Sequence, residues 1–375
     1  VTDAYVGFLP PLLPELMDKH SLSIAKAATL TMLLSLATSL PQPVMGYWAD
    51  RVGRKPFVIF GPALSAAVLA LMGWAPSYVL LILLLVVGGL GAAAFHPPGA
   101  SLATRVTEGR GSGVRLSVFS FGGAAGYALG PGLAIWTVSR FGLEGLWVAM
   151  IPGLLIAALL WPLVPGGSSD GRLPRPPRPR ELLTHLKGPL GLLFGISALA
   201  AFVQRTFLTL EPIIIDVAGG SQSERGLALT LYLGAQAVGT LTSGFLTDRM
   251  DRGKLLVVLT LLATPAHLLA FSLPHTSIGG MLAIGAAGFL NMAMLPPIVV
   301  MAQEIIPAGA AVGSGIVMGL AWSVASLALI IPGWLGDLVG PLRAGQLVTP
   351  VLLLGTLLAL HPSLRGRPGE GLSGG

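Results

Sequence analysis

Three ionisable residues lie inside long apolar stretches of the sequence: Asp3, His96 and Arg205. Ionisable side chains are costly in the hydrocarbon core of a membrane, so residues of this kind are functional candidates. A carboxyl group or an imidazole can take up and release a proton when its surroundings shift its pKa. A guanidinium can bind an anionic group through two parallel hydrogen bonds. The three residues therefore favour proton transfer and anion binding within a membrane.

Asp3 is the residue that we favour for proton binding, with His96 as the second. Asp3 lies about fifteen residues before the end of its apolar stretch, which at about 1.5 Å per residue places it near mid-membrane, towards the cytoplasmic side. It can pair with Arg205, or Arg205 can bind an anionic substrate while Asp3 is protonated. Each role has an alternative. The Asp3–Arg205 pair can be purely structural, Asp3 can be a carboxylate solvated in the aqueous cytoplasmic mouth, and His96 can be a hydrogen-bonded packing residue.

Other polar and aromatic residues within apolar stretches are candidates, with Arg205, for a substrate-binding pocket. They are Gln204, Tyr127, Asn291, Gln236 and Trp322. Hydrogen bonds between helices explain the same residues equally well. Glu15 and Glu211 lie near the ends of their stretches, where we expect water at the membrane interface to solvate them.

The composition indicates that these residues are carried by membrane-spanning helices. The chain has 375 residues, of which 53% are hydrophobic and 10% charged, with a mean hydropathy of +0.81. Soluble domains carry about 25% charged residues. Apolar runs of about 20 residues can cross a membrane as helices, and the alternating pattern of barrel strands is absent. The sequence predicts an all-α, polytopic membrane protein.

Twelve spans are predicted, in two six-helix bundles. They cover 1–17, 23–47, 57–75, 78–104, 113–138, 143–164, 188–217, 224–246, 254–273, 277–303, 309–334 and 344–362. Residues 1–164 form the first bundle, the Pro- and Arg-rich segment 165–187 a cytoplasmic linker, and 188–375 the second bundle with a short tail. Basic residues gather in the loops of one side, which predicts a plasma-membrane protein with both termini cytoplasmic.

The net charge of +6 is explained by this topology, so we expect no nucleic-acid partner. The chain has no cysteine, and no second histidine lies at a ligand spacing from His96, so neither a metal nor another cofactor is expected. Catalytic constellations such as Ser/His/Asp or HExxH are also missing from the sequence. An enzyme is therefore not expected.

Two short basic loops repeat between the halves: GYWADRVGRK (46–55) and GFLTDRMDRGK (244–254). Asp50 and Asp248 are 248 − 50 = 198 positions apart, and Pro97 and Pro296 are 296 − 97 = 199 apart. Two parallel repeats of this kind build transporters whose halves rock. The loops and the adjoining helix ends are candidates for a conformational latch: Gly46, Asp50, Arg51, Arg54, Lys55, Arg105, Asp248, Arg249, Arg252 and Glu304.

We expect two ion pairs in this latch, Asp50 with Arg105 and Arg252 with Glu304. Asp50 can also accept hydrogen bonds from a helix start within 309–314, and Gly46 lets another helix approach closely. The alternative is that the basic residues only set the topology of the chain.

These loops resemble the signature of the major facilitator superfamily. TDAY (2–5), QPVMGYW (42–48), AFHPPGASLATR (94–105), SVFSFGGAAGYALGP (117–131) and MAQEIIP (301–307) look like the fosmidomycin-resistance branch of its bacterial exporters. Two departures stand out. Leu133 and Ala134 replace glycines of the antiporter signature, and Leu85 stands where many proton-coupled members carry arginine. The missing arginine shifts the expected proton coupling onto Asp3, His96 and Arg205.

The resemblance implies a proton-driven exporter of small amphipathic or anionic compounds that works by alternating access. A facilitator or importer of a metabolite or lipid is the alternative on the same scaffold. An intramembrane enzyme or receptor is a third possibility from a different class. The expected partners are a small-molecule substrate, protons and the lipid bilayer, and the chain is expected to act as a monomer.

Overall fold

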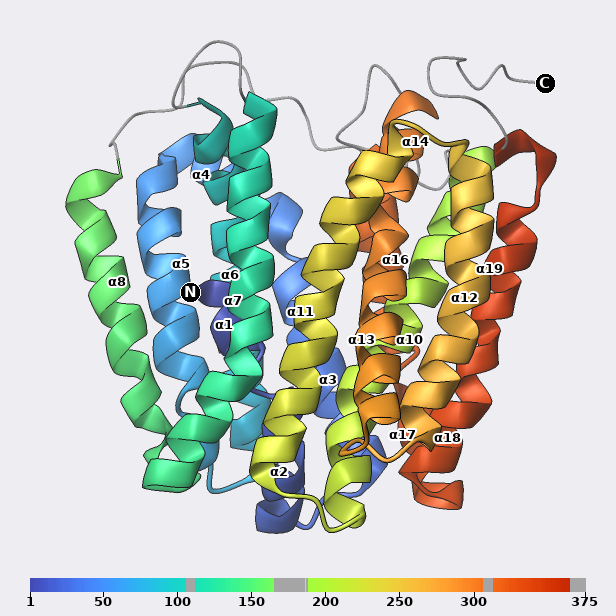
Figure 1. Cartoon of the computed structure of the whole chain (residues 1–375). Coiled ribbons are helices and arrows are strands. Elements are labelled where there is room, and N and C mark those ends of the chain that lie inside the picture. The colour runs from blue at the N-terminus through green and yellow to red at the C-terminus, as the bar shows by residue number, and fades with distance from the viewer. Residues whose placement is uncertain (106–111, 165–185, 187, 306–312, 365–375) are drawn as a thin grey trace. The chain divides into compact units, whose positions relative to one another are not determined.

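The computed structural model describes the chain except for residues 106–111, 165–185, 187, 306–312 and 365–375. All the regular elements of the described residues are helices (Figure 1). They divide into two compact units. Unit 1 comprises Val1–Pro176 with Gly220–Thr230, and unit 2 comprises Pro177–Gly219 with Leu231–Gly375.

Unit 1 contains the N-terminal helices and the first part of α11. Its elements are α1 (Thr2–Val6), η1 (Pro10–Leu12), α2 (Leu13–His20), α3 (Ile24–Ser39), α4 (Gln42–Val52), α5 (Arg54–Leu69), η2 (Met72–Trp74), α6 (Tyr78–Arg105), α7 (Ser112–Phe141), η3 (Glu144–Ala149) and α8 (Met150–Leu163). The first predicted span is thus divided into three short helices. Pro10, Pro11 and Pro14 explain the interruptions, because proline donates no backbone hydrogen bond.

Unit 2 is built from α10 (Pro189–Val217) and the helices that follow it. These are the rest of α11 (Gln222–Thr247), α12 (Arg252–Ser272), α13 (Ile278–Ala293), α14 (Leu295–Ile305), the π-helical segment η5 (Gly315–Leu320), α16 (Ala321–Leu327), α17 (Ile330–Val339), α18 (Pro341–Val348), η6 (Thr349–Val351), α19 (Leu352–Ala359) and η7 (Pro362–Leu364). Leu193, Ile196 and Val203 of α10 lie in its apolar core.

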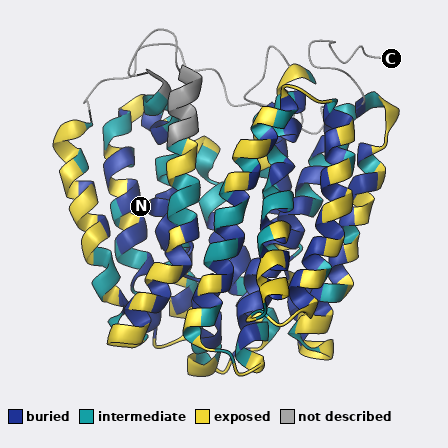
Figure 2. Ribbon diagram, viewed as in Figure 1, coloured by how far each residue is buried: buried dark blue, intermediate teal, exposed yellow. Residues whose placement is uncertain are grey.

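Nine helical stretches among the described residues are long and apolar enough to cross a membrane. The other three predicted spans are the interrupted first stretch, α7 and α11. Exposed residues, yellow in Figure 2, recur along several helices, and many of them are large and apolar; Leu159 and Leu163 of α8, for example, are 68% and 73% exposed. An apolar exterior of this kind matches lipid rather than water.

The two basic loops are shorter than predicted, because helix occupies most of each. In the first, α4 continues to Val52, Gly53 alone makes the turn with φ at +101°, and α5 begins at Arg54. In the second, α11 ends at Thr247 and Asp251 caps α12 by accepting a hydrogen bond of 2.8 Å from the Lys254 backbone N–H. The charged residues of the first loop therefore sit on helix ends, whereas Asp248, Arg249 and Asp251 of the second lie in the short connection between α11 and α12.

Glycines of α7 let α1 approach closely, as the Gly-rich sequence around Pro131 predicts. A Cβ added at Gly130 would lie 2.4 Å from the Ala4 carbonyl oxygen, and one at Gly123 would lie 2.9 Å from Asp3 Oδ2. Gly46 has the same role on α4, where an added Cβ would lie 3.2 Å from Pro97 of α6. These contacts position α1, and with it Asp3, against the rest of unit 1.

Replacement of Gly130 by alanine is expected to destabilise the protein by about 1–3 kcal/mol, because the methyl group would overlap a backbone carbonyl that cannot move alone. The matched control is Gly122→Ala on the same helix, where nothing described lies within 4 Å of the added Cβ. We expect this control to be neutral or slightly stabilising. Thermal unfolding in detergent measures both, and equal transitions for the two variants would contradict the α1–α7 packing.

Candidate functional site

The Asp3 carboxylate and the His96 imidazole are in direct contact within unit 1, and the contact is an ion pair when His96 is protonated. His96 Nε2 lies 3.1 Å from Asp3 Oδ1, and their side chains are 29% and 22% exposed. The sequence singles out both residues, but it does not indicate that they pair. Two groups that can each carry a proton are thus held in direct contact, so the charge state of one depends on that of the other.

Three helices hold this pair in place. Asp3 lies on α1, which the Tyr5 hydroxyl fixes by donating to the Ala149 carbonyl at 2.5 Å. His96 lies on α6 beside Phe95, and the two ring centres are 5.7 Å apart. The absence of a side chain at Gly123 of α7 leaves room for Asp3 Oδ2. The packing of α1, α6 and α7 therefore fixes the positions of Asp3 and His96.

The prolines that follow His96 do not divide α6, which continues to Arg105. Pro97 and Pro98 lie inside this helix and remove two backbone hydrogen-bond donors from it. Their repeat counterparts behave differently. In unit 2 the helix is interrupted at Met294, and Pro296 and Pro297 fall in the first turn of α14, where proline is tolerated.

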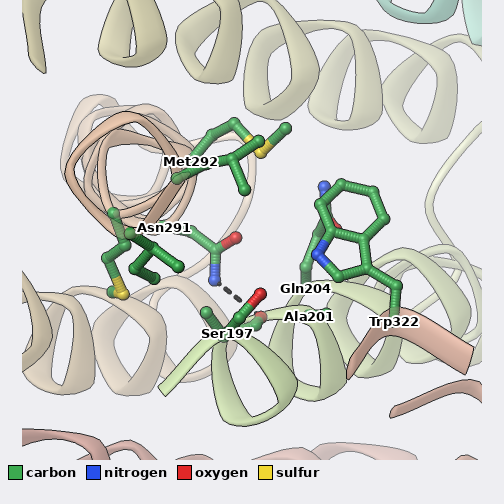
Figure 3. Close-up of a pocket in the computed structure, with 10 residues that line it drawn as sticks. Ser197, Ala201, Gln204, Asn291, Met292 and Trp322 are labelled. Carbon is green, nitrogen blue, oxygen red and sulfur yellow. Dashed lines mark hydrogen bonds between the residues drawn. The ribbon is translucent and has the colours of Figure 1, made fainter. Parts of the chain in front are cut away.

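Unit 2 contains a small, open recess with room of about 10 Å³, close to the space that one water molecule needs (Figure 3). The residues that line it come from α10, from the α13–α14 junction and from α16: Ser197, Ala200, Ala201, Gln204, Asn291, Met292, Met294, Leu295, Ile298 and Trp322. Three of the residues predicted to bind substrate are among them, namely Gln204, Asn291 and Trp322.

The other predicted substrate residues fall in different places. Gln236 is not among the lining residues, but its Oε1 accepts a hydrogen bond of 2.9 Å from Gln204 Nε2. The Arg205 guanidinium lies 5.6 Å from the centre of the Trp322 ring. Tyr127 belongs to unit 1, where its backbone and ring pack against Gly7. The predicted Asp3–Arg205 ion pair joins residues of different units and stays a prediction.

A π-helical segment supports the recess, and no pattern in the sequence predicts it. The Ser197 hydroxyl donates at 2.5 Å to the carbonyl of Val317, which lies within Gly315–Leu320. Trp322 follows this segment after one residue. Single π-helical turns occur frequently at functional sites of helical proteins. Ser197 is the residue that sequence reasoning missed here, and serine is too common in membrane helices to be singled out.

A second missed residue is His267, which is fully buried on α12. Its Nδ1 lies 2.8 Å from the Ala263 carbonyl and its Nε2 lies 3.0 Å from the Tyr232 hydroxyl. A neutral imidazole fits both contacts, donating to the carbonyl and accepting from tyrosine. The Tyr232 ring in turn stacks on Phe207 with centres 4.2 Å apart. This arrangement is typical of a packing histidine.

The expectation that Glu15 and Glu211 are solvated at the interface is wrong. Glu15 Oε1 accepts hydrogen bonds from Arg225 and, at 2.8 Å, from Gln222 Nε2, and the Arg225 side chain is only 3% exposed. Glu211 of α10 is 2% exposed. The positions near the ends of the apolar stretches suggested water, whereas neighbouring helices cover both side chains.

One of the two predicted latch ion pairs is present. Arg252 Nη1 lies 2.5 Å from Glu304 Oε2, and Arg252 Nε also donates to the Thr247 carbonyl at 3.3 Å. Asp50 pairs instead with Arg54, one turn along the chain. The side chain of Arg105 and most of 309–314 lie outside the described residues, so the other partners predicted for Asp50 are not tested.

The remaining latch candidates lie against aromatic rings or in the open. The Arg51 guanidinium is 4.5 Å from the centre of the Tyr47 ring, Lys55 Nζ is 5.4 Å from that of Trp161, and the Arg249 guanidinium is 3.3 Å from that of Phe245. Asp248 is exposed. Cations beside exposed aromatic rings fit the edge of a membrane.

Comparisons with known proteins agree with this geometry. The model of the Major Facilitator Superfamily matches residues 2–219. The chain is 25% identical to a "Fosmidomycin resistance protein" of Escherichia coli, over 97% of this chain and 91% of that protein. It is also 25% identical to the multi-drug resistance efflux pump PmrA of Streptococcus pneumoniae, over 69% of this chain and 67% of the pump.

Solved structures show the same fold at low identity. A bacterial homologue of the human lysosomal transporter Spinster matches with a TM-score of 0.77 and 18% identity, over 95% of this chain and 94% of that one. The nucleoside transporter NupG matches with a TM-score of 0.75 and 13% identity, over 96% and 98%. The resemblance seen in the sequence motifs is thereby confirmed for the fold, with its two helical bundles.

Replacement of Arg225 by glutamine is expected to destabilise the protein by about 3 kcal/mol, because Glu15 would lose its charged partner in a covered position. The matched control is Glu144→Gln, which breaks the Lys19–Glu144 pair of the same unit, where Glu144 is 76% exposed. Exposed pairs contribute little, so this control should unfold near the wild-type temperature. Similar unfolding temperatures for Arg225→Gln and wild type would show that the buried pair is unimportant.

Reversal of one charge in the Arg252–Glu304 pair is expected to reduce transport, and reversal of both is expected to restore it. Arg252→Glu places two carboxylates together, whereas Arg252→Glu with Glu304→Arg restores attraction. Glu304 is partly exposed, so the change in unfolding free energy should be no more than about 1 kcal/mol. Flux and thermal unfolding are measured on all three variants, and failure of the double reversal to recover flux would argue against pairing as the functional contact.

Proposed function

Because the chain belongs to the Major Facilitator Superfamily, we propose that it is a proton-coupled exporter of small amphipathic or anionic compounds. Membership in this family makes it a membrane transporter rather than an enzyme. The proposal adds the direction of transport, the coupling ion and the substrate class.

The observation that carries the proposal is the Asp3–His96 ion pair. An ionised aspartate with a protonated histidine has no net charge. Addition of a proton to the carboxylate, or its removal from the imidazole, leaves one uncompensated charge among mostly apolar helices. Such a charge is costly in a membrane protein, so each proton step favours a different arrangement of the surrounding helices. This link between protonation and conformation is what proton-driven transport requires.

The recess of unit 2 is the part of the molecule that we propose to bind substrate, with Arg205 next to Trp322 to receive an anionic group. The names of two relatives refer to drug resistance and efflux, which supports export. Fosmidomycin, from the name of one of them, is accordingly the first compound to test. Its transport by this chain is a proposal that rests on 25% identity.

The arrangement in the cell is part of the same proposal. We place the chain in the plasma membrane as a monomer, with both termini and the basic loops in the cytoplasm. Residues 1–164 and 188–375 would act as the two rocking bundles, with 165–187 as the linker between them. The basic loops, with the Arg252–Glu304 pair, would close the cytoplasmic side in one conformation.

Transport in proteoliposomes tests the proposal directly. With the vesicle interior made acidic, proton exit should drive accumulation of fosmidomycin by the wild-type protein. Asp3→Asn and His96→Gln should lose this gradient-driven accumulation, because neither side chain can then carry the proton. Both variants should keep exchange of labelled for unlabelled compound without a gradient, since the recess is intact.

Asp18→Asn is the matched control, since Asp18 is an exposed aspartate of the same unit, and it should behave as wild type. Gradient-driven accumulation that is unchanged in both Asp3→Asn and His96→Gln would remove the pair from the mechanism. Flux through the wild-type protein that does not depend on the pH gradient would favour the alternative function, a facilitator. If fosmidomycin is not transported, a substrate is sought by comparing the growth of cells with and without the protein on a panel of compounds.

A further inference from the structure

We propose that Glu211 of α10 is a second proton-binding site, whose carboxyl group holds a proton in this conformation and exchanges it with water when the surrounding helices move. The inference deepens the proposed function, and only the use of the proton in transport rests on that function. It adds a proton site in unit 2 to the Asp3–His96 contact of unit 1.

The first observation is that Glu211 is buried without a partner. The residue is 2% exposed, and its Oε2 lies in the protein interior without a hydrogen bond. No hydrogen bond or ion pair joins its side chain to another residue in the part of the chain that the structure describes. Glu15, by contrast, is bound by Arg225 and Gln222. A buried carboxylate that lacks such partners is so costly that the group keeps its proton instead.

The second observation is the aromatic packing on this face of α10. Phe207 lies one helical turn before Glu211, so the two side chains share a face of the helix. The Phe207 ring is fully buried, stacks on Tyr232 with centres 4.2 Å apart, and lies 5.3 Å from the centre of the Phe271 ring. The face that carries Glu211 is therefore packed against α11 and α12 within unit 2. Aromatic rings cannot replace the hydration of a negative charge.

Titratable groups on the neighbouring helices do not compensate a charge on Glu211. The elements of unit 2 that pack closely on α10 are α12, α13, α14, η5, α16, α17, α18 and α19. His267 of α12 is bonded to Tyr232 of α11, and Arg252 of α12 pairs with Glu304 of α14. The other charged side chains of these elements are exposed: Lys254, Asp337 and Arg343.

The two other charged residues of α10 do not supply a counter-charge either. Arg205 lies six residues before Glu211, which corresponds to about 9 Å along the helix axis, and its guanidinium lies beside Trp322. Asp216 is acidic and would repel a second negative charge. Among the described residues, therefore, no cation is placed to stabilise an ionised Glu211 in this conformation.

Exchange of the proton is possible because Glu211 lies near one end of α10. The helix ends at Val217, six residues later, which corresponds to about 9 Å along the axis. Pro212 follows Glu211 directly and leaves the Leu208 carbonyl without its helical donor, a feature at which helices bend. Movement at this turn would admit water to the carboxyl group. The proposed topology places this end of α10 outside the cell, the side from which a proton-driven exporter takes up protons.

Infrared spectroscopy measures the charge state of Glu211 directly. A protonated carboxyl group has a carbonyl stretching band at higher frequency than the amide bands of a protein, and an ionised carboxyl group does not. The purified full chain is studied at neutral pH, where exposed acids are ionised, in a maltoside detergent that has no carbonyl group. We expect this band in the wild-type protein and its loss in Glu211→Gln, which keeps nearly the same size.

Two control variants assign the band. Glu144→Gln makes the same substitution at a side chain that is 76% exposed, and it should keep the band. Asp3→Asn should also keep it, which separates the band from a proton on Asp3. Thermal unfolding verifies that each variant is folded. If Glu211→Gln does not fold, Glu211→Asp takes its place, and the band should then change its frequency because the carboxyl group has moved.

A change of solvent tests the exchange of the proton. On transfer to D₂O, the band of a carboxyl group that exchanges its proton moves to lower frequency. We expect the band assigned to Glu211 to move in this way. A band that stays in place would show a permanently enclosed proton, which is incompatible with a site that exchanges.

The inference is overturned if the wild-type spectrum lacks the band, if the band is unchanged in the folded Glu211 variant, or if it does not respond to D₂O. The measurement uses no substrate and no proton gradient. Absence of the band with intact gradient-driven flux would reject this inference alone. A band assigned to Glu211 without proton-linked flux would reject the proposed coupling and leave the proton site standing.

Discussion

Lipid hydrocarbon offers no hydrogen-bond partner, and this constraint governs the structure at every level. Backbone groups of the spanning segments must pair within helices, and polar side chains must find partners in the protein. Thr137, Thr240, Thr260 and Thr349 each donate to the carbonyl four residues earlier, at 2.7–2.9 Å. The Gln204–Gln236 bond is a pairing of the same kind between helices. Polar residues that are common in these helices are thereby accommodated without a functional role.

The same constraint makes interruptions of the helical backbone hydrogen bonding informative, because the freed backbone groups need other partners. In unit 2 the α13–α14 junction at Met294 and the π-helical segment Gly315–Leu320 both alter the regular ladder. Both also supply or precede residues of the recess, and two side-chain hydrogen bonds to backbone carbonyls stabilise this region, Ser197 to Val317 and Asn291 to Ala200. Irregular backbone at membrane depth is tolerated where it lines a cavity or is buried in protein. The recess therefore lies beside two interruptions of the regular helices of unit 2.

How far the sequence predicts this molecule depends on the range of the interaction. The apolar stretches and the Gly-rich sequence of α7 are local patterns, and the structure confirms the helices and the close α1–α7 contacts that they predict. The Arg252–Glu304 pair could be predicted because Glu304 ends an apolar stretch on the same side of the predicted membrane as the basic loop that contains Arg252. The Glu15–Arg225 pair joins positions 210 apart with no repeat relation, so burial could not be inferred from either residue alone. His267 and Tyr232 were missed for the same reason, since the contact exists only once α11 and α12 pack.

The repeat also relates the ion pair of unit 1 to the recess of unit 2. Asp3 corresponds to Ala201 (201 − 3 = 198) and His96 to Leu295 (295 − 96 = 199), and both counterparts line the recess. The same two positions of the repeat therefore carry a titratable pair in one unit and small or apolar side chains in the other. A carboxylate facing an imidazole makes a mutual contact in unit 1, whereas alanine and leucine line the recess with Asn291 and Trp322 in unit 2. Under the proposed function, divergence at these two duplicated positions separates the proton site of unit 1 from the substrate recess of unit 2.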